Sequence, residues 1–185
     1  MSGILGVSTL KFLDLEDSKG DTWLLKRASD KLSKHMREIS PDIVITHDSS
    51  GWNGYPDHKA DYNITVAAFN RQNTSKLQKL YHSTLLLQVL DKLNLPDQVK
   101  ENIMKFVTVS DKKITSIIEL NEKELENKFK LLNIYKSQFP DDNGLYYKMP
   151  LKVLNTLTAY ESFYMNNICI KTNINYGCVD ILDII

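Results

Sequence analysis

The sequence predicts an α/β or α+β fold that is rich in helix and contains a small, at least partly parallel sheet. An amphipathic segment at 22–40 lies between two apolar segments with high β propensity, 4–13 and 42–46. This alternation is typical of a βαβ unit, whose strands pair in parallel across a right-handed helical crossover. A hydrophobic content of 42% with 25% charged residues is that of a globular domain.

Local signals place the elements of the first seventy residues. The apolar run at 4–13 (ILGVSTLKFL) is predicted to form a first strand. The helix over 22–40 should end at its last residue, because Pro41 disfavours helical geometry in the residue before it. A short buried strand follows at 42–46, and YNITVAAF at 62–69 is the next expected strand.

After residue 70 the pattern is mainly helical. We expect, in chain order, a helix over 74–90, a shorter helix that begins at Pro96, a strand at 107–109, a helix over 121–139, a turn at 140–144, a helix over 150–167, and apolar returning segments at 168–170 and 179–185. The turn divides the chain into an α/β core, 1–139, and a C-terminal helix and strand, 140–185, which we expect to pack on the same domain.

The balance of charged residues does not indicate a strongly charged partner such as nucleic acid. Lys plus Arg and Asp plus Glu number 23 each, whereas nucleic-acid-binding domains commonly have a pI above about 9. No apolar run approaches the roughly 18 residues of a membrane span, and the N-terminus lacks the basic start of a secretory signal. Two cysteines, Cys169 and Cys178, are compatible with reduced thiols. We therefore expect a cytoplasmic protein that binds neither nucleic acid nor membrane.

The densest group of chemically active residues lies at 46–61, THDSSGWNGYPDHKAD, directly after the buried strand. Loops at such strand ends carry binding groups in α/β proteins. The candidate ligand-binding residues are Asp48, Ser49, Ser50 and Asp61. The candidate metal ligands are Asp57, His58 and Asp61, which offer the nitrogen and oxygen atoms that zinc, manganese or iron prefers.

A second interpretation of this loop stays open. The spacing matches no established metal motif, and adjacent strand residues such as His47 and Asp48 point to opposite faces. The loop can equally be a polar surface connection that is held by Asx turns, with Trp52 and Tyr55 packed beneath it. His82, among apolar neighbours, is expected to be a buried histidine with satisfied hydrogen bonds and not a catalytic base.

Aromatic residues are concentrated in the C-terminal third of the chain. Aromatic rings with a polar tip are enriched at protein interfaces, although at helical spacing they also pack in the core. The candidate interface residues are Tyr146, Tyr147, Tyr160, Phe163 and Tyr164. Together with the apolar end at 181–185, they favour a protein partner or a homo-oligomer.

Two segments resemble the N-terminal half of glycosyltransferases with two Rossmann domains. These segments are GDTWLLKRASDKLSKHM at 20–36 and YPDHKADYNI at 55–64, where the family has a G-x-x-W helix ahead of an A-D-[IVY]-N strand. The resemblance implies a Rossmann-like half that would work on a nucleotide sugar. It transfers no catalytic residue, because 185 residues do not contain the second, donor-binding domain.

These observations lead to two functional hypotheses. The first is a non-enzymatic protein that acts by protein binding or self-assembly; frequent Lys, Asn and Ile are typical of A/T-rich coding sources such as many viruses, so a viral protein is part of this hypothesis. The second is a glycosyltransferase-like enzyme or subunit that binds a nucleotide sugar or a metal at 46–61. No cofactor is indicated by the sequence itself.

Overall fold

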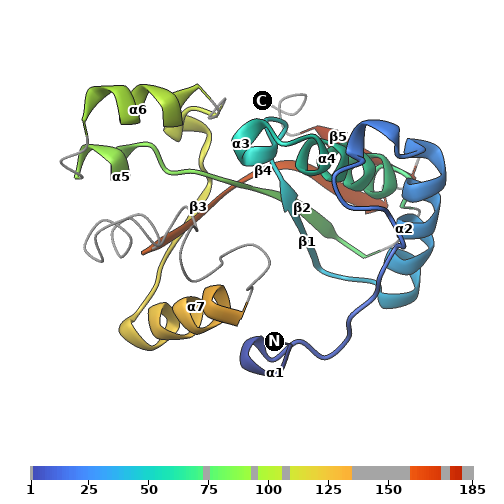
Figure 1. The fold of residues 1–185 in the computed structure, drawn as a ribbon. Coiled ribbons are helices and arrows are strands. Elements are labelled where there is room, and N and C mark those ends of the chain that lie inside the picture. The colour runs from blue at the N-terminus through green and yellow to red at the C-terminus, as the bar shows by residue number, and fades with distance from the viewer. Residues whose placement is uncertain are drawn as a thin grey trace.

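The computed structural model describes residues 2–72, 76–92, 96–105, 109–134, 159–171 and 176–180 (Figure 1). These residues form an α/β fold around a mixed sheet with the strand order β1-β2-β4-β3, in which β5 also pairs with β4. Strands β1 and β2 are parallel, and every other pair is antiparallel. The predicted α/β class, with a sheet that is parallel in part, is confirmed.

The strands and helices have the following bounds. The strands are β1 (Ile43–His47), β2 (Gln78–Thr84), β3 (Ser116–Glu119), β4 (Tyr160–Lys171) and β5 (Tyr176–Asp180). The helices are α1 (Ser2–Leu5), α2 (Leu25–Ile39), α3 (Gly51–Gly54), α4 (Pro56–Phe69), α5 (Gln88–Asp91), α6 (Asp97–Met104) and α7 (Glu122–Ile134), with short 3-10 turns at Gly20–Thr22 and Asp111–Lys113.

The predictions with the clearest start and stop signals are confirmed. The expected helix at 22–40 is α2, which ends where Ser40 adopts a left-handed conformation with φ 50° and donates its N–H to Met36 O. The strand expected at 42–46 is β1, but it is not the buried strand that was expected, because Ile43 and Ile45 are 53% and 57% exposed. The helices expected from Pro96 and over 121–139 are α6 and α7.

Two predictions in the first seventy residues are wrong. The segment 4–13 forms no strand, and Phe12 is 73% exposed, so the parallel partner of β1 is β2. The segment 62–69 is not a strand but the second half of α4. Pro56 occupies the first turn of that helix, and Ile64, Ala68 and Phe69 are buried at helical spacing.

Parts of two helices expected later in the chain are strands instead, and residues 150–158 of the second lie outside the described residues. Within 74–90, residues 78–84 form β2, in which fully buried and half-buried side chains alternate. Its buried positions include the polar Gln78 and His82, so its apolar residues do not show the alternation of a strand. Within 150–167, the residues from Tyr160 onward form β4.

Some predictions fall outside the described residues. The turn at 140–144 lies there entirely, as do residues 107 and 108 of the strand expected at 107–109. The division into 1–139 and 140–185 therefore stays a prediction. Among the described residues, no helix is long and apolar enough to cross a membrane.

The core lies between the sheet and the helix pair α2 and α4, which pack against each other beside the parallel strands (Figure 1). Phe69 of α4 and Leu80 of β2 are fully buried at its centre, with Val44 of β1 packed against them. Arg71 joins the helix pair by donating to Ser29 Oγ at 2.8 Å and Asp30 Oδ1 at 2.7 Å. This packing fixes α4, and hence the loop ahead of it, over the end of β1.

We expect Leu80→Ala to lower the free energy of unfolding by about 2–5 kcal/mol, because it leaves a cavity in a site that is 0% exposed. Leu77, three residues earlier and 44% exposed, provides the matched control, and Leu77→Ala should cost less than about 1 kcal/mol. Urea unfolding of the three proteins measures both values. Equal losses for the two variants would contradict this location of the core.

Candidate functional site

The 46–61 segment leaves the C-terminal end of β1, makes the short helix α3 and enters α4. Gly51 has a φ of +65°, and a Cβ there would lie 2.9 Å from Lys59 N and 3.0 Å from His58 Cβ. Gly54 also has a positive φ, and Pro56 begins α4. The two glycines therefore let the loop fold back tightly onto the first turn of α4.

His47, the last residue of β1, is paired with Asp61 of α4. Their Nδ1 and Oδ2 atoms are 2.8 Å apart, and Thr46 Oγ1 donates to the same oxygen at 2.9 Å. A carboxylate accepts, so Nδ1 carries the proton and Nε2 is the basic nitrogen of neutral His47. Burial by itself raises the pKa of Asp61, but the hydrogen bonds from His47 and Thr46 outweigh it and lower the pKa below 3.8.

His58 lies directly against this pair. Its ring stacks on the His47 ring with centroids 4.3 Å apart and planes 9° apart. His58 Nδ1 donates to Gly51 O at 3.0 Å, since a carbonyl can only accept, so its Nε2 is also the basic nitrogen. Tyr55 is a further neighbour, with its ring centroid 5.5 Å from that of His58.

Asp57 points to a different part of the chain. Its two carboxylate oxygens accept the backbone N–H groups of Ser18 and Gly20, each at 2.7 Å. Asp57, His58 and Asp61 thus have different first partners, and no group of three or more His, Cys, Asp or Glu side chains that could hold a metal occurs in the described part of the chain. A metal at these three residues stays a prediction.

Asp48 anchors a buried polar network beneath the loop. It is 1% exposed and accepts from Ser50 N at 2.9 Å, from Ser50 Oγ, and from Thr84 Oγ1 of β2 at 2.9 Å. Ser49 hydrogen-bonds Tyr164 of β4 through its backbone and its side chain. Of the four predicted ligand-binding residues, Asp48, Ser49 and Ser50 therefore hold the loop to the sheet, while Asp61 pairs with His47.

His82 on β2 connects the network to the histidine pair. Its fully buried ring lies between Tyr62, at 5.2 Å, and Tyr164, at 4.8 Å between centroids. Its Nδ1 donates to His47 O at 3.1 Å. Burial, aided by the negative charge of Asp48, raises the pKa of the Tyr164 hydroxyl above its ordinary value. The expectation that His82 is buried is confirmed, although it lies on a strand.

The remaining interface candidates are spread along the sheet. Tyr160 is the first residue of β4, where its hydroxyl donates to Glu119 at 3.3 Å and Lys92 Nζ lies 5.2 Å from its ring centroid. Phe163 is half-buried within β4, and Tyr146 and Tyr147 lie outside the described residues. An interface made by these residues stays a prediction.

Sequence reasoning did not select His47, Thr84 or the pairing of Tyr164 with the loop. The sequence indicates only that the side chains of His47 and Asp48 point to opposite faces of the strand. The structure does direct them to different partners, Asp61 and Thr84. Thr84 carries no local signal, because its role depends on the parallel register that sets His47 opposite Ser83.

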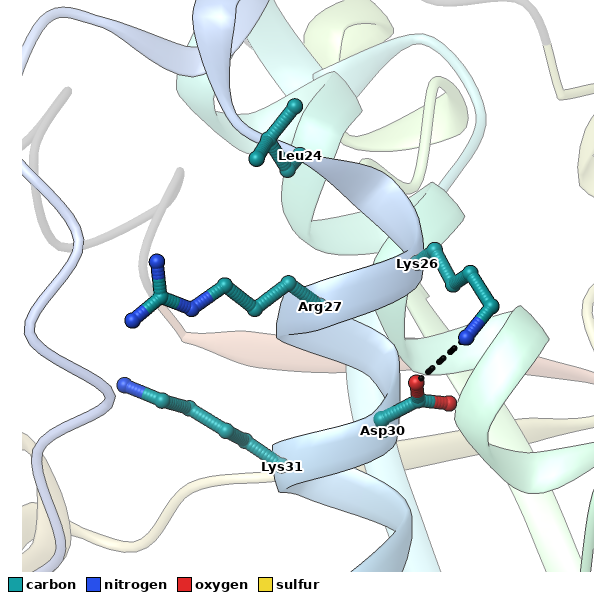
Figure 2. A pocket seen from close by; sticks show the side chains of 5 residues that line it. All are labelled: Leu24, Lys26, Arg27, Asp30 and Lys31. Atoms are coloured by element: carbon teal, nitrogen blue, oxygen red, sulfur yellow. Dashed lines mark hydrogen bonds and ion pairs between the residues drawn. The ribbon is translucent and has the colours of Figure 1, made fainter.

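A shallow pocket lies away from this loop, on the outer side of α2 (Figure 2). Arg27 and Lys31 extend to one side of the helix, and Lys26 pairs with Asp30 on the other, with 3.2 Å between their charged atoms. The lining residues are Leu24, Lys26, Arg27, Asp30 and Lys31.

Comparison with known proteins shows a similarity that includes the whole loop. A family model described as PIG-L, GlcNAc-PI de-N-acetylase, matches residues 1–69. The chain is also 29% identical, over 113 residues, to 1D-myo-inositol 2-acetamido-2-deoxy-alpha-D-glucopyranoside deacetylase 1 of Frankia casuarinae. The aligned region covers 50% of this chain and 37% of that deacetylase.

Two further relatives carry related names. The deacetylase of Gordonia bronchialis is 39% identical over 54 residues, which is 28% of this chain and 19% of the relative. Deacetylase 1 of Frankia alni is 39% identical over 46 residues, or 25% and 16% of the two chains. The chain thus spans well under half the length of the curated relatives it matches.

These similarities correct the functional predictions. The resemblance to glycosyltransferases is wrong, because the same residues match a de-N-acetylase family model. The prediction of a non-enzymatic protein that acts by protein binding or self-assembly is wrong as well, since the relatives are named as deacetylases. For the same reason, the predictions of a viral protein, an oligomer and a glycosyltransferase-like protein are wrong. The sequence failed here because short segments such as A-D-Y-N occur in many α/β proteins. Which partners the protein has stays untested.

We expect Asp61 to stabilise the fold most at neutral pH. Its pKa in the folded state lies below its ordinary value of 3.8, so its contribution is complete above that value and is lost as the pH falls below it. Urea unfolding of wild type and Asp61→Asn from pH 7 to pH 3 should give a stability difference that shrinks at the acidic end. Glu38→Gln, which removes an exposed carboxylate 3.5 Å from His35, is the control and should have little effect. A difference that does not change with pH contradicts the Asp61 assignment.

We expect Asp48→Ala to lower the free energy of unfolding by about 2–5 kcal/mol, because it leaves the hydrogen-bond donors of Ser50 and Thr84 without their buried acceptor. Asp42 directly precedes β1, and its side chain is 77% exposed and pairs with Lys76. Asp42→Ala should therefore cost about 1 kcal/mol or less. Thermal unfolding ranks the two variants, and the reverse order would contradict the buried network.

Proposed function

We propose that this chain forms the part of an N-deacetylase that carries a histidine–carboxylate catalytic pair, His47 and Asp61. The observation that supports this proposal is that the family match, residues 1–69, contains the whole arrangement of His47, His58 and Asp61. The activity is a proposal, because the chain spans well under half the length of the relatives it matches.

The reaction is the hydrolysis of an acetamide. Water adds to the amide carbonyl, the C–N bond breaks, the acetyl group leaves as acetate, and the nitrogen takes a proton to become the free amine. This chemistry needs a group that removes a proton from water and returns one to the leaving nitrogen. A neutral imidazole with one nitrogen bound to a carboxylate is suited to both steps.

His47 has this geometry. Its Nδ1–H is held by Asp61, and its ring is partly exposed, so water or substrate can reach Nε2. Asp61 keeps the ring in one tautomer and stabilises the positive charge that forms when Nε2 takes a proton. His58, stacked on His47 with its own Nδ1 bound to Gly51 O, presents a second basic Nε2, which can accept a hydrogen bond from the amide N–H of the substrate.

The substrate class follows from the relatives. Their names describe an acetamido sugar joined to inositol, and the family description names an N-acetylglucosaminyl group on a phosphatidylinositol. The shared chemistry is an N-acetylglucosamine linked to inositol. We propose this class as substrate, and the cytoplasm, as expected from the sequence, as the location.

The decisive experiment is to measure acetate release by the full chain from 1D-myo-inositol 2-acetamido-2-deoxy-α-D-glucopyranoside. We expect His47→Ala to lower kcat by roughly 10²–10⁴-fold, the usual contribution of a positioned acid–base group. His35→Ala, which removes a histidine on α2, is the matched control and should retain wild-type activity. Failure of the wild-type chain to release acetate contradicts the proposed function, and an active His47→Ala contradicts the role of His47.

A metal test can be made in the same assay. We propose His58 Nε2 and Oδ1 of Asp61 as the metal-binding atoms of the predicted set, as the alternative to a hydrogen bond between His58 and the amide. Both carboxylate oxygens of Asp57 already accept backbone N–H groups, whereas His47 and Thr46 bind only Oδ2 of Asp61. Dialysis against a chelator should then lower acetate release, and zinc or manganese should restore it. Full activity after exhaustive chelation would contradict metal binding at these residues.

A further inference from the structure

The 14–20 loop, Asp14 to Gly20, is fastened to the first turn of α4 by an unusually specific set of contacts. Asp57 accepts the N–H groups of Ser18 and Gly20, each at 2.7 Å. Tyr55 and Ser18 hydrogen-bond through their hydroxyls at 2.8 Å. A Cβ at Gly20 would lie 2.6 Å from Asp57 Cα, so only glycine allows this approach.

The loop adopts a conformation that it would not keep alone. Asp14 and Ser18 have φ values of 56° and 60°, in the left-handed region that residues other than glycine seldom adopt. Such conformations persist where surrounding contacts over-determine them, and they are concentrated at ligand-binding sites. Both of the hydrogen bonds that Asp57 accepts come from backbone N–H groups of the segment in which Ser18 has its left-handed conformation.

The loop also lies next to the proposed site. Ser18 bonds Tyr55, whose ring is 5.5 Å from the His58 ring, and His58 stacks on His47. A continuous series of contacts therefore joins the 14–20 loop to the catalytic pair. An aromatic ring and a hydroxyl-bearing loop beside the reacting group are the surfaces on which a sugar ring can rest.

We propose that Asp57 is a positioning residue that holds the 14–20 loop as the wall of the sugar-binding site. This inference rests on the proposed deacetylase function. The loop contributes binding energy that is equal in the ground state and the transition state. Release of the loop therefore raises KM and leaves kcat nearly unchanged. A group that took part in the chemical step would change kcat instead.

Two variants release the loop in different ways. Asp57→Asn keeps only one acceptor oxygen for two N–H groups, whereas Gly20→Ala keeps the carboxylate and forces the loop away by steric contact. We expect both to raise KM for the inositol-linked N-acetylglucosamine by about 10-fold, with kcat within about 3-fold of wild type. Asp21→Asn, an equal loss of charge on an exposed neighbour of Gly20, is the control and should leave KM unchanged.

Trp23 provides a readout that does not depend on activity, because its indole Nε1–H donates to Glu16 O at 2.9 Å. In a Trp52→Phe background, where Trp23 is the sole tryptophan, we expect Asp57→Asn and Gly20→Ala to shift its emission to longer wavelength. Tyr55→Phe, which removes one hydroxyl and keeps the carboxylate contacts, should give a smaller shift in the same direction and serves if either stronger variant does not fold.

Four outcomes test the proposal. A KM increase with a Trp23 shift in both loop variants supports the proposal. A fall in kcat for Asp57→Asn with unchanged Trp23 emission, beside a normal Gly20→Ala, overturns it and makes Asp57 a catalytic residue. If no variant, including wild type, releases acetate, the deacetylase proposal fails, while unshifted Trp23 emission in Asp57→Asn, Gly20→Ala and Tyr55→Phe would separately overturn the positioning role.

Discussion

The buried carboxylate of Asp48 is the interaction on which the rest of the site depends. It occupies the position at which β1 ends, and its two oxygens accept from Ser50 of the loop and from Thr84 at the end of β2. A buried carboxylate is costly unless donors satisfy it, so the strand ends and the loop must adopt the one arrangement that supplies them. That arrangement turns the chain towards α4 and separates the side chain of Asp48 from that of His47.

The orientation of the histidines follows from this turn. His47 and His58 each commit Nδ1 to an acceptor within the protein, Asp61 and Gly51 O, and each therefore leaves Nε2 as its basic nitrogen. The two rings are stacked nearly parallel, so the two histidines lie against each other at one site. One imidazole can then take a proton from the attacking water while the other accepts a hydrogen bond from the amide N–H of the same substrate.

The elements that the sequence predicted well are those whose local and tertiary preferences agree. In α2 the apolar stripe, the polar opposite face and the Pro41 stop all indicate the same helix, and the residues at 43–45 form a strand as their β propensity indicates. At 62–69 the β-branched Ile64, Thr65 and Val66 indicated a strand, but the helix that begins at Pro56 continues through them because Phe69 and Ile64 then reach the core.

For the site, residue types located the correct loop but not the correct pairs. Local spacing connected Asp57, His58 and Asp61, whereas the structure separates them because Asp57 serves a segment 37 and 39 residues earlier in the chain. His47 pairs with Asp61 over fourteen positions through the geometry of one turn between strand and helix. Contacts of this kind depend on tertiary packing, and no periodicity in a single sequence encodes them.

The buried network also shows that the matched region does not act alone. The family match ends at residue 69, which is the last residue of α4. Yet Asp48 depends on Thr84, Ser49 on Tyr164, and His47 O on His82, and all three partners come from β2 or β4. Because β2 and β4 pair directly, with His82 opposite Tyr164, one antiparallel register aligns both supports of the loop. The chemistry proposed from residues 1–69 is therefore held in place by strands that lie beyond them.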